Sequence, residues 1–278
     1  MRFVRDLPGT PDDTRPSGDF VEALARGLDV ITTFGPTASV LTVAEVAART
    51  GLARPTARRL LLTLEHLGYV RASNGAYSLT TRVLRLGTAS IHAQGIWEIA
   101  RPHLVDLVRQ TNESSSMSQL DGSDIVYTAR VAVPKIIALS VTIGTRFPAT
   151  ATSMGRVLLS DLSDDDAARA VATPSTSGVI PRVIPSGAEL VTSLAEIRER
   201  GWAMSDELLS VGIRSIAAPV RDQTGRTVAA MNVTVHAAET SIDRLVGEHL
   251  PRLLETAAAV TDEWSNLGLL PVAKATAP

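Results

Sequence analysis

Apolar residues recur at helical spacing through the first eighty positions of the chain. Over residues 20–34 this spacing predicts an amphipathic helix that is capped by Asp19 and has an apolar face of Phe20, Leu24, Leu28, Ile31 and Phe34. Thr42 and Glu45 have the spacing of a capping box, which predicts a short second helix ending at Gly51. A third helix is expected from Arg54-Pro55 to Gly68, with a core-facing side of Ala57, Leu60, Leu61, Leu64 and Leu67.

Two short β-prone runs after the third helix predict a hairpin. Residues 69–73 and 76–79 flank Asn74-Gly75, and Asn-Gly is the strongest short-range sequence for a tight hairpin turn. The resulting order of helix, short helix, tight turn, helix and hairpin is typical of a winged helix-turn-helix. The alternative is a generic three-helix domain followed by an unrelated hairpin.

The rest of the chain mixes helical and strand-like segments. An amphipathic helix is expected at 96–110, after a linker helix capped by Thr80 or Thr81. Strands are expected at 115–120, 125–131, 136–143, 202–204, 213–220 and 227–235, and further helices at 153–160, 164–172, 188–200 and 241–264. This succession predicts an α+β fold with helices packed on an antiparallel sheet.

These segments define the expected domain boundaries. They are a disordered N-terminus over 1–18, a winged helix-turn-helix over 19–81, the linker helix over 82–95, an α+β domain over 96–264 and a flexible tail over 265–278.

Composition narrows the chemistry open to the chain. It has no cysteine, and its five histidines lack close ligand spacing, so we expect no metal site. No segment has the roughly 20 apolar residues of a membrane helix, and the polar N-terminus lacks a signal-peptide core, so we expect a cytoplasmic protein. The net charge is −2, but eight arginines and four acids give residues 20–90 a charge of +4. A basic segment on an acidic chain favours a polyanionic partner for one end only.

Two parts of the chain resemble the IclR family of bacterial regulators. ALARGLDVITTFG, LTVAEVAARTGLARPTARRLLLTLEHLGYV and YSLTTRVLRLG, within residues 20–87, are similar to that family's DNA-binding half. GTRFPATATSMGRVLLS (144–160) and SIAAPVRDQTGRTVAAMNVTV (215–235) are similar to its GAF-like effector domain, and the first resembles the β-ketoadipate-pathway branch. The resemblance implies that 96–264 is an effector-binding domain for protocatechuate, 4-hydroxybenzoate or β-ketoadipate, molecules of aromatic-acid catabolism.

The third helix carries most of the residues expected to contact DNA. Its N-terminal side chains would enter the major groove, where arginine offers a bidentate fork for guanine and a charge for phosphate. The free amides at the start of the second helix suit a phosphate, and the hairpin suits the DNA backbone. For each single arginine the alternative is a solvated surface position. The predicted DNA-binding residues are Thr42, Arg54, Pro55, Thr56, Arg58, Arg59, Arg71 and Tyr77.

Residues 152–155 are the best candidate for a small-molecule site. They open a predicted helix whose free amides and partial positive charge suit an anion, and Arg130, Arg146 or Arg156 would pair with its carboxylate. The resemblance places the family's effector pocket between this helix and the sheet. The alternative is ordinary capping over an ordinary core. The predicted effector-binding residues are Met117, Leu120, Tyr127, Arg130, Arg146, Thr152, Ser153, Met154, Gly155, Ala217, Met231 and Asn232.

The sequence favours a regulator over an enzyme, because it contains no G-x-S-x-G, Walker loop or G-x-G-x-x-G motif. We expect an operator-binding regulator that forms a homodimer or homotetramer, needs no cofactor and responds to a small carboxylate, either an aromatic acid or a dicarboxylate derived from one. The alternative is a small-molecule-sensing interaction protein that does not read DNA sequence. Operator binding in the presence of competitor DNA separates the two.

Overall fold

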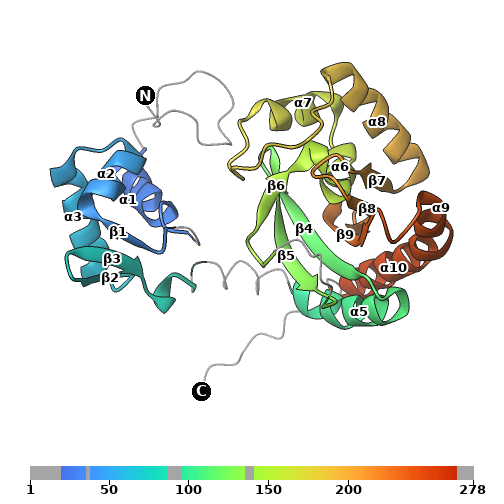
Figure 1. The fold of residues 1–278 in the computed structure, drawn as a ribbon, viewed down its shortest axis with the longest axis horizontal. Coiled ribbons are helices and arrows are strands. Elements are labelled where there is room, and N and C mark those ends of the chain that lie inside the picture. Colours follow the sequence, from blue (N-terminus) through green and yellow to red (C-terminus); the bar gives the residue numbers. More distant parts are fainter. Residues whose placement is uncertain (1–19, 36–37, 85, 87–94, 135–140, 268–278) are drawn as a thin grey trace. The chain divides into compact units, whose positions relative to one another are not determined.

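The chain divides into two compact units, Met1–Ala93 and Gln94–Pro278 (Figure 1). The computed structural model describes residues 20–35, 38–84, 86, 95–134 and 141–267. None of the helices formed by these residues is long and apolar enough to cross a membrane.

The N-terminal unit is the predicted winged helix-turn-helix. Three helices pack on a three-stranded antiparallel sheet of order β1-β3-β2, around a core that includes Val30, Leu41, Val46, Leu61 and Val70. Strand β1, which pairs with the hairpin, was not predicted from the sequence. The elements are α1 (Glu22–Thr32), β1 (Val40–Thr42), α2 (Val43–Thr50), α3 (Arg54–His66), β2 (Val70–Ser73) and β3 (Ala76–Leu79).

Local sequence fixes the turns of this unit. The capping box is complete, because the Glu45 amide donates to Thr42 Oγ1 at 3.3 Å and the Thr42 amide donates to Glu45 Oε2 at 2.7 Å. Gly51 ends α2 with φ 69°. Asn74 and Gly75 have φ values of 51° and 78°, as a two-residue hairpin turn requires, and both residues tolerate this conformation.

The C-terminal unit contains a six-stranded antiparallel sheet of order β6-β5-β4-β9-β8-β7, which confirms the expected α+β fold. Its strands are β4 (Ser114–Asp121), β5 (Asp124–Val131), β6 (Arg146–Pro148), β7 (Ala203–Asp206), β8 (Ile213–Arg221) and β9 (Thr227–His236). Its main helices are α5 (Ile96–Thr111), α6 (Ser153–Ser160), α7 (Asp164–Ala172), α8 (Gly187–Arg200) and α10 (Leu250–Leu267).

Helices cover both faces of this sheet (Figure 1). Helices α5 and α10 pack on one face over a core that includes Met117, Ile216 and Met231. Helix α6 lies on the other face over Tyr127 and Ala217, and α8 packs against α6. Because side chains alternate along a strand, each strand supplies residues to both cores.

Several predicted elements differ in the structure. Helix α1 begins at Glu22, and Leu24 and Leu28 on its predicted core face are 63% and 50% exposed. The end of the predicted face is confirmed, because Ile31 packs against the core and Phe34, just after the helix, is buried; Val30 is buried as well. The predicted cap Asp19 and most of the linker helix 82–95 lie outside the described residues. The described part of this region has a 3-10 turn, Thr81–Val83, capped by Thr80, and helical conformation at Leu84 and Leu86.

Two further differences lie in the C-terminal unit. The predicted strand 136–143 is wrong over 141–143, which is not a strand; 136–140 lie outside the described residues, and the edge strand β6 follows instead. The helix predicted over 241–264 is present as one continuous helical run, with Ser241 as its cap, but it contains a π-helical turn (Leu245–His249) between α9 (Ile242–Arg244) and α10. Since α10 continues to Leu267, the tail predicted from 265 begins too early.

Candidate DNA-binding and effector-binding sites

Helix α3 presents a row of arginines to solvent. Ala57, Leu61 and Leu64 face the core, and Arg54, Arg58 and Arg59 are consequently exposed on the other sides of the helix. None of these arginines forms an ion pair with a carboxylate in the described part of the chain. Pro55 lies at the start of the helix, where no amide donor is lost, and Thr56 is half-buried beside the arginines.

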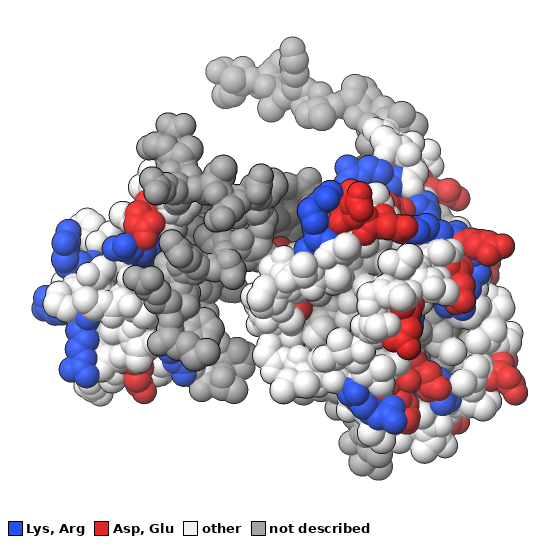
Figure 2. All heavy atoms as spheres, turned by 90° about the horizontal axis from the view of Figure 1, so that it is seen from above, with Lys and Arg blue, Asp and Glu red and all other residues white. Residues whose placement is uncertain are grey.

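Figure 2 shows basic side chains on the N-terminal unit with few acids between them, whereas charges of both signs alternate over the C-terminal unit. A basic surface with unpaired guanidinium groups suits the phosphate backbone of DNA.

Only one of the two residues predicted to contact DNA from the wing, the β2–β3 hairpin, is exposed. Arg71 is exposed on β2, and its Nε donates to Ser78 Oγ at 3.1 Å, which holds the side chain on the outer face of the sheet. Tyr77 was predicted to contact the DNA backbone, but only 8% of it is exposed and it packs in the core. The reason is that β3 is the central strand of the sheet, so residues 77 and 79 point inward when residue 78 points outward.

The prediction for Thr42 also needs correction. Its hydroxyl and amide are both bonded to Glu45, so they are not free for a phosphate. These hydrogen bonds lower the pKa of Glu45, and the ionised carboxylate repels a phosphate at this helix end.

Gly155 is required for close packing between α6 and the turn that precedes it. A Cβ at Gly155 would lie 2.2 Å from the carbonyl oxygen of Ala149, because the turn before α6 passes directly against the helix. The Thr152 hydroxyl accepts the Gly155 amide at 3.1 Å, and Met154 is buried in the core below. The sequence interpretation, in which glycine admits a ligand, is therefore wrong for Gly155.

The predicted strand residues divide between the two faces of the sheet. Met117 and Met231 lie on the face covered by α5 and α10, so they do not belong with a pocket beside α6. Met231 and Asn232 are adjacent in one strand and cannot share a face. Tyr127, Ala217 and Leu120 pack on the α6 side.

A β-bulge brings Arg130 to the α6 side as well. Ala129 pairs with Met117 and Tyr127 pairs with Ser118, which leaves Thr128 as an extra residue in β5. Arg130 pairs with Ser116, Ser116 with Asn232, and Asn232 with Ala217, so this row of residues crosses the four neighbouring strands β5, β4, β9 and β8.

Arg130 is a half-buried cation with vacant donors. Its Nη1 donates to Ser116 Oγ at 3.1 Å, and no described carboxylate lies within ion-pair distance. Burial lowers the pKa of Arg130, and the nearby Tyr127 opposes that shift. Burial also raises the pKa of Tyr127 to about 12, so the phenol stays neutral. A partly desolvated guanidinium without a counter-charge is costly, and a bound anion would offset that cost.

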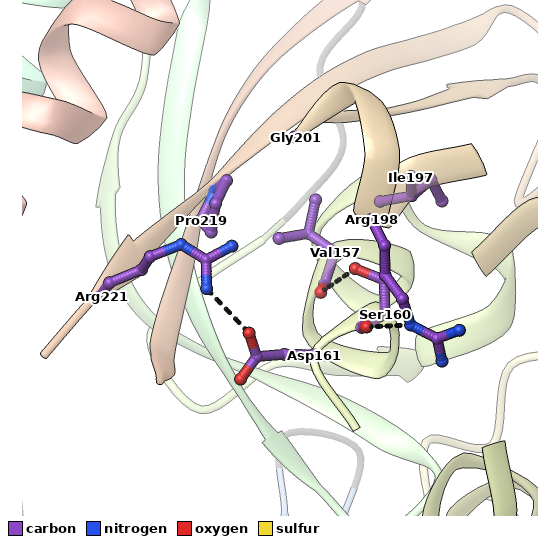
Figure 3. A pocket seen from close by; sticks show the side chains of 8 residues that line it. All are labelled: Val157, Ser160, Asp161, Ile197, Arg198, Gly201, Pro219 and Arg221. Atoms are coloured by element: carbon purple, nitrogen blue, oxygen red, sulfur yellow. Dashed lines mark hydrogen bonds and ion pairs between the residues drawn. The ribbon is translucent and has the colours of Figure 1, made fainter. Parts of the chain in front are cut away.

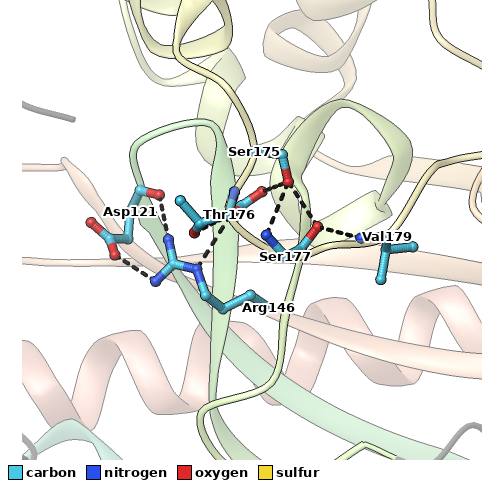
Figure 4. A network of polar contacts seen from close by, with 7 residues as sticks. Asp121, Arg146, Ser175, Thr176, Ser177 and Val179 are labelled. Carbon is cyan, nitrogen blue, oxygen red and sulfur yellow. Dashed lines mark hydrogen bonds and ion pairs between the residues drawn. The ribbon is translucent and has the colours of Figure 1, made fainter. Parts of the chain in front are cut away.

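The other two candidate arginines differ from each other: Arg146 is paired with carboxylates, whereas Arg156 is hydrogen-bonded to neutral groups and its buried Nε has no partner among the described residues. Arg146 donates from Nη1 to Asp121 at 2.6 Å and from Nε to Asp124 at 3.3 Å. Asp124 also accepts hydrogen bonds from Ser175 and Thr176, so this network holds the segment after α7 against β5 and β6 (Figure 4). Arg156 points toward α8 and bonds to Ser193 and the Met204 carbonyl. The predicted pairing of Arg146 with a ligand is therefore wrong.

Hydroxyl and amide side chains continue from Arg130 along this face. They form a polar strip, defined here as Arg130, Ser116, Asn232, Thr234, Ser215 and Ser153. Asn232 Nδ2 donates to Thr234 Oγ1 at 3.0 Å, and the hydroxyls of Ser215 and Ser153 are 2.7 Å apart.

Sequence reasoning missed Ser116, Thr234 and Ser215. The available signal was the run Ser114-Ser115-Ser116, which is unusually polar for a central strand of a sheet.

A cavity of about 310 Å³ lies at the opposite end of α6, lined by Val157, Ser160, Asp161, Ile197, Arg198, Gly201, Pro219 and Arg221 (Figure 3). Both of its arginines are paired, Arg221 with Asp161 at 2.8 Å and Arg198 with Asp164 at 2.7 Å. None of the predicted effector residues lines it. Because this cavity offers no uncompensated charge, the polar strip is the stronger candidate for an anion site.

Family models match both units. Residues 23–73 match the IclR helix-turn-helix domain, and residues 88–262 match the bacterial transcriptional regulator IclR C-terminal domain.

The chain belongs to the IclR family of transcriptional regulators.

Individual relatives agree with this assignment. The chain is 36% identical over 237 residues to the Pca regulon regulatory protein of Pseudomonas putida, covering 85% of this chain and 81% of the relative. It is 32% identical over 244 residues to the p-hydroxybenzoate hydroxylase transcriptional activator of Acinetobacter baylyi, covering 86% and 90%. A crystal structure of a putative transcriptional regulator from Rhodococcus sp. RHA1 superposes with a TM-score of 0.76 at 43% identity, covering 89% of this chain and all of the other.

Membership of the IclR family confirms three expectations from the sequence: the family resemblance, the fold and a DNA-binding regulator in place of an enzyme. The basic face of α3 and the polar strip are therefore the candidate sites for DNA and for a small molecule among the described residues.

Proposed function

We propose that this chain is an operator-binding regulator whose affinity for DNA is changed by a small carboxylate bound at Arg130. The single observation that carries the proposal is the half-buried Arg130 guanidinium, which lacks a carboxylate partner among the described residues and bonds only to Ser116. The missing counter-charge is the charge that a carboxylate would supply. Hydrogen bonds to a charged group contribute about 1.5–3 kcal/mol each, enough for a specific anion site.

The names of two relatives support the proposal that the effector is an aromatic acid or a dicarboxylate derived from one. One relative is a Pca regulon regulatory protein and the other is a p-hydroxybenzoate hydroxylase transcriptional activator.

The DNA half of the proposal rests on α3 and the wing. Arg54, Arg58 and Arg59 would reach base edges or phosphates, Thr56 would add a hydroxyl contact and Arg71 would contact the backbone. Pro55 would set the start of the helix in the groove. A protein that meets operators in this way works in the cytoplasm.

We also propose that the chain acts as a homo-oligomer, at least a dimer. Phe20, Val21, Leu24 and Leu28 are between 44% and 63% exposed at the start of α1, and such a patch on a small domain marks a contact surface. Two-fold symmetry would match a palindromic operator whose half-sites are spaced by about 34–36 Å or a multiple of it.

Isothermal titration calorimetry tests the effector site. Protocatechuate, 4-hydroxybenzoate and adipate, a linear dicarboxylate, would be titrated into the wild type, Arg130→Gln and the matched control Arg169→Gln, whose arginine is exposed on α7. At least one acid should bind the wild type and the control, and its binding to Arg130→Gln should weaken by about tenfold or more. Equal binding to all three proteins, or none to the wild type, would show the effector site to be misplaced.

A second experiment separates sequence-specific binding from the interaction-protein alternative. A duplex selected by the protein from a random library is titrated in excess competitor DNA. Retention of the selected duplex supports operator recognition, and its loss supports a protein that does not read sequence.

A further inference from the structure

We infer that Leu62 reads the methyl group of a thymine when α3 lies in the major groove, so that the operator carries a thymine at the base pair that this side chain meets. The inference rests on the DNA half of the proposed function, because it assigns base specificity to the same helix. Its two supports are the position of Leu62 on α3 and the chemistry of the base edges in the major groove.

Leu62 lies on the arginine side of α3. It follows Arg58 by four residues and Arg59 by three. At about 3.6 residues per turn, these separations place Leu62 about 40° from Arg58 and about 60° from Arg59 around the helix axis. Leu62 therefore lies between the two arginines when the helix is viewed along its axis, on the side away from the buried Ala57 and Leu64.

The surface around Leu62 is accessible and basic. The side chain of Leu62 is 40% exposed, whereas that of its neighbour Leu61 is fully buried in the core. Glu65, the one acid of α3, is turned to the wing, where its Oε1 accepts the Ala72 amide at 3.3 Å. DNA that approaches the arginines of this helix would consequently meet Leu62 as well.

The spacing along α3 places Leu62 over base edges. Recognition helices such as that of the homeodomain contact DNA with residues separated by three, four and seven positions. The same spacing is found here at Pro55, Arg58, Arg59 and Leu62. A rise of about 1.5 Å per residue puts Leu62 about 6 Å beyond Arg58, which is roughly two base pairs at about 3.4 Å each.

The major groove offers a leucine one favourable partner. Thymine presents its C5-methyl group there, whereas guanine, adenine and cytosine present hydrogen-bond donors and acceptors. A leucine placed against those polar edges would displace water without replacing its hydrogen bonds, which is unfavourable. Against thymine, both apolar groups leave water together. Leu62 consequently favours thymine at its position.

The test is a thermodynamic cycle between Leu62 and the methyl group. In the duplex selected by the full-length protein, each thymine in turn is replaced by deoxyuridine, which lacks only the methyl group. Fluorescence anisotropy at fixed salt measures the affinity of the wild type and of Leu62→Ala. At one thymine position the replacement should weaken wild-type binding by about three- to fivefold, the effect of exposing one buried methyl group. Leu62→Ala should bind both forms of that duplex equally.

Leu67→Ala is the matched control. Leu67 is 47% exposed at the end of α3, but it is turned about 140° away from Leu62 around the helix axis. This variant should discriminate between thymine and deoxyuridine as the wild type does. Alanine favours helix, so both variants should keep the fold, and thermal melts check this.

The outcomes separate the inference from the proposed function. A wild type that discriminates at no thymine, a selected duplex without thymine, or wild-type discrimination in Leu62→Ala would overturn the inference while operator binding stands. If Leu62→Ala weakens binding to both forms by the same factor, Leu62 serves another contact and the inference fails. If the protein selects no duplex, the proposed function and the inference fail together.

Discussion

Gly155 and Ala149 pack so closely that a single methyl group would not fit between them. A Cβ on Gly155 would lie 2.2 Å from the Ala149 carbonyl oxygen and 2.4 Å from its Cα. The contact seats the turn Ala149–Ala151 against the start of α6, and therefore fixes where Ser153 meets the sheet.

Gly155→Ala should destabilise the C-terminal unit. Backbone atoms must move to admit the methyl group, and overpacking of this kind costs about 1–3 kcal/mol. Gly27→Ala is the control, since Gly27 lies within α1 with open space where a Cβ would be placed, and alanine there should stabilise by about 0.5–1 kcal/mol. Chemical denaturation measures both. If the two variants shift stability equally, the close contact does not constrain α6.

Arg58→Ala and Arg59→Ala should weaken DNA binding without unfolding the protein. Both side chains are exposed opposite the buried face of α3. A lost phosphate contact should reduce the slope of log affinity against log salt by about one, and a lost base contact should cost ~1–3 kcal/mol at one operator position. Arg26→Ala, on α1 and paired with Glu22, is the control. Unchanged affinity in both variants would disprove the role of α3 as recognition helix.

Acidification should destabilise the segment after α7, because protonation of Asp124 weakens its hydrogen bonds to that segment. Burial raises the pKa of Asp124, but hydrogen bonds from Ser175, Thr176 and Arg146 outweigh it and hold the pKa below its usual value. A lowered folded-state pKa gives stability that is present above the unfolded pKa, about 4, and is lost as pH falls through the folded pKa.

Thermal melts between pH 3 and pH 7 check this dependence. Asp124→Asn should lower the melting temperature at pH 7 and flatten the loss of stability on acidification, because asparagine cannot ionise. Asp165→Asn, at an exposed position of α7, should follow the wild type. A parallel acid response in wild type and Asp124→Asn would rule out Asp124 as a source of this stability.

Introducing charged residues on the exposed side of α1 should dissociate the oligomer into single chains. Leu24 and Leu28 lie one helical turn apart and are at least half exposed, so a second copy of the chain is expected to cover them. Leu24→Glu combined with Leu28→Glu should reduce the mass in light scattering toward that of one chain. Val191→Glu, an exposed apolar position of α8, should leave it unchanged. A wild type that is monomeric at micromolar concentration, with and without DNA, contradicts this proposal.

The fold was largely predictable because local rules decide it. The Thr42 capping box, the Asn74-Gly75 turn and the apolar spacing of α3 act within a few residues, and the structure contains all three. Strand β1 was not predictable, because three residues become a strand only through pairing with the distant β3.

The candidate site was less predictable than the fold. Which side Arg130 faces depends on the bulge at Thr128, and whether Arg146 is free depends on Asp121 and Asp124, which approach it only in the folded sheet. Sequence therefore identified Arg130 as one of three equivalent cations. The folded sheet separates it from Arg146, which is paired with two aspartates, and places Arg156 against α8 instead of the polar strip.

The central claim is that a carboxylate at Arg130 changes the affinity of this regulator for its operator. The most direct measurement is fluorescence anisotropy of the selected duplex at fixed salt, with the tightest-binding acid from calorimetry added to wild type and Arg130→Gln. The account predicts that the acid changes wild-type affinity by about 5–150-fold and leaves the variant's affinity unchanged. An acid that shifts both proteins equally, or shifts neither, would contradict it.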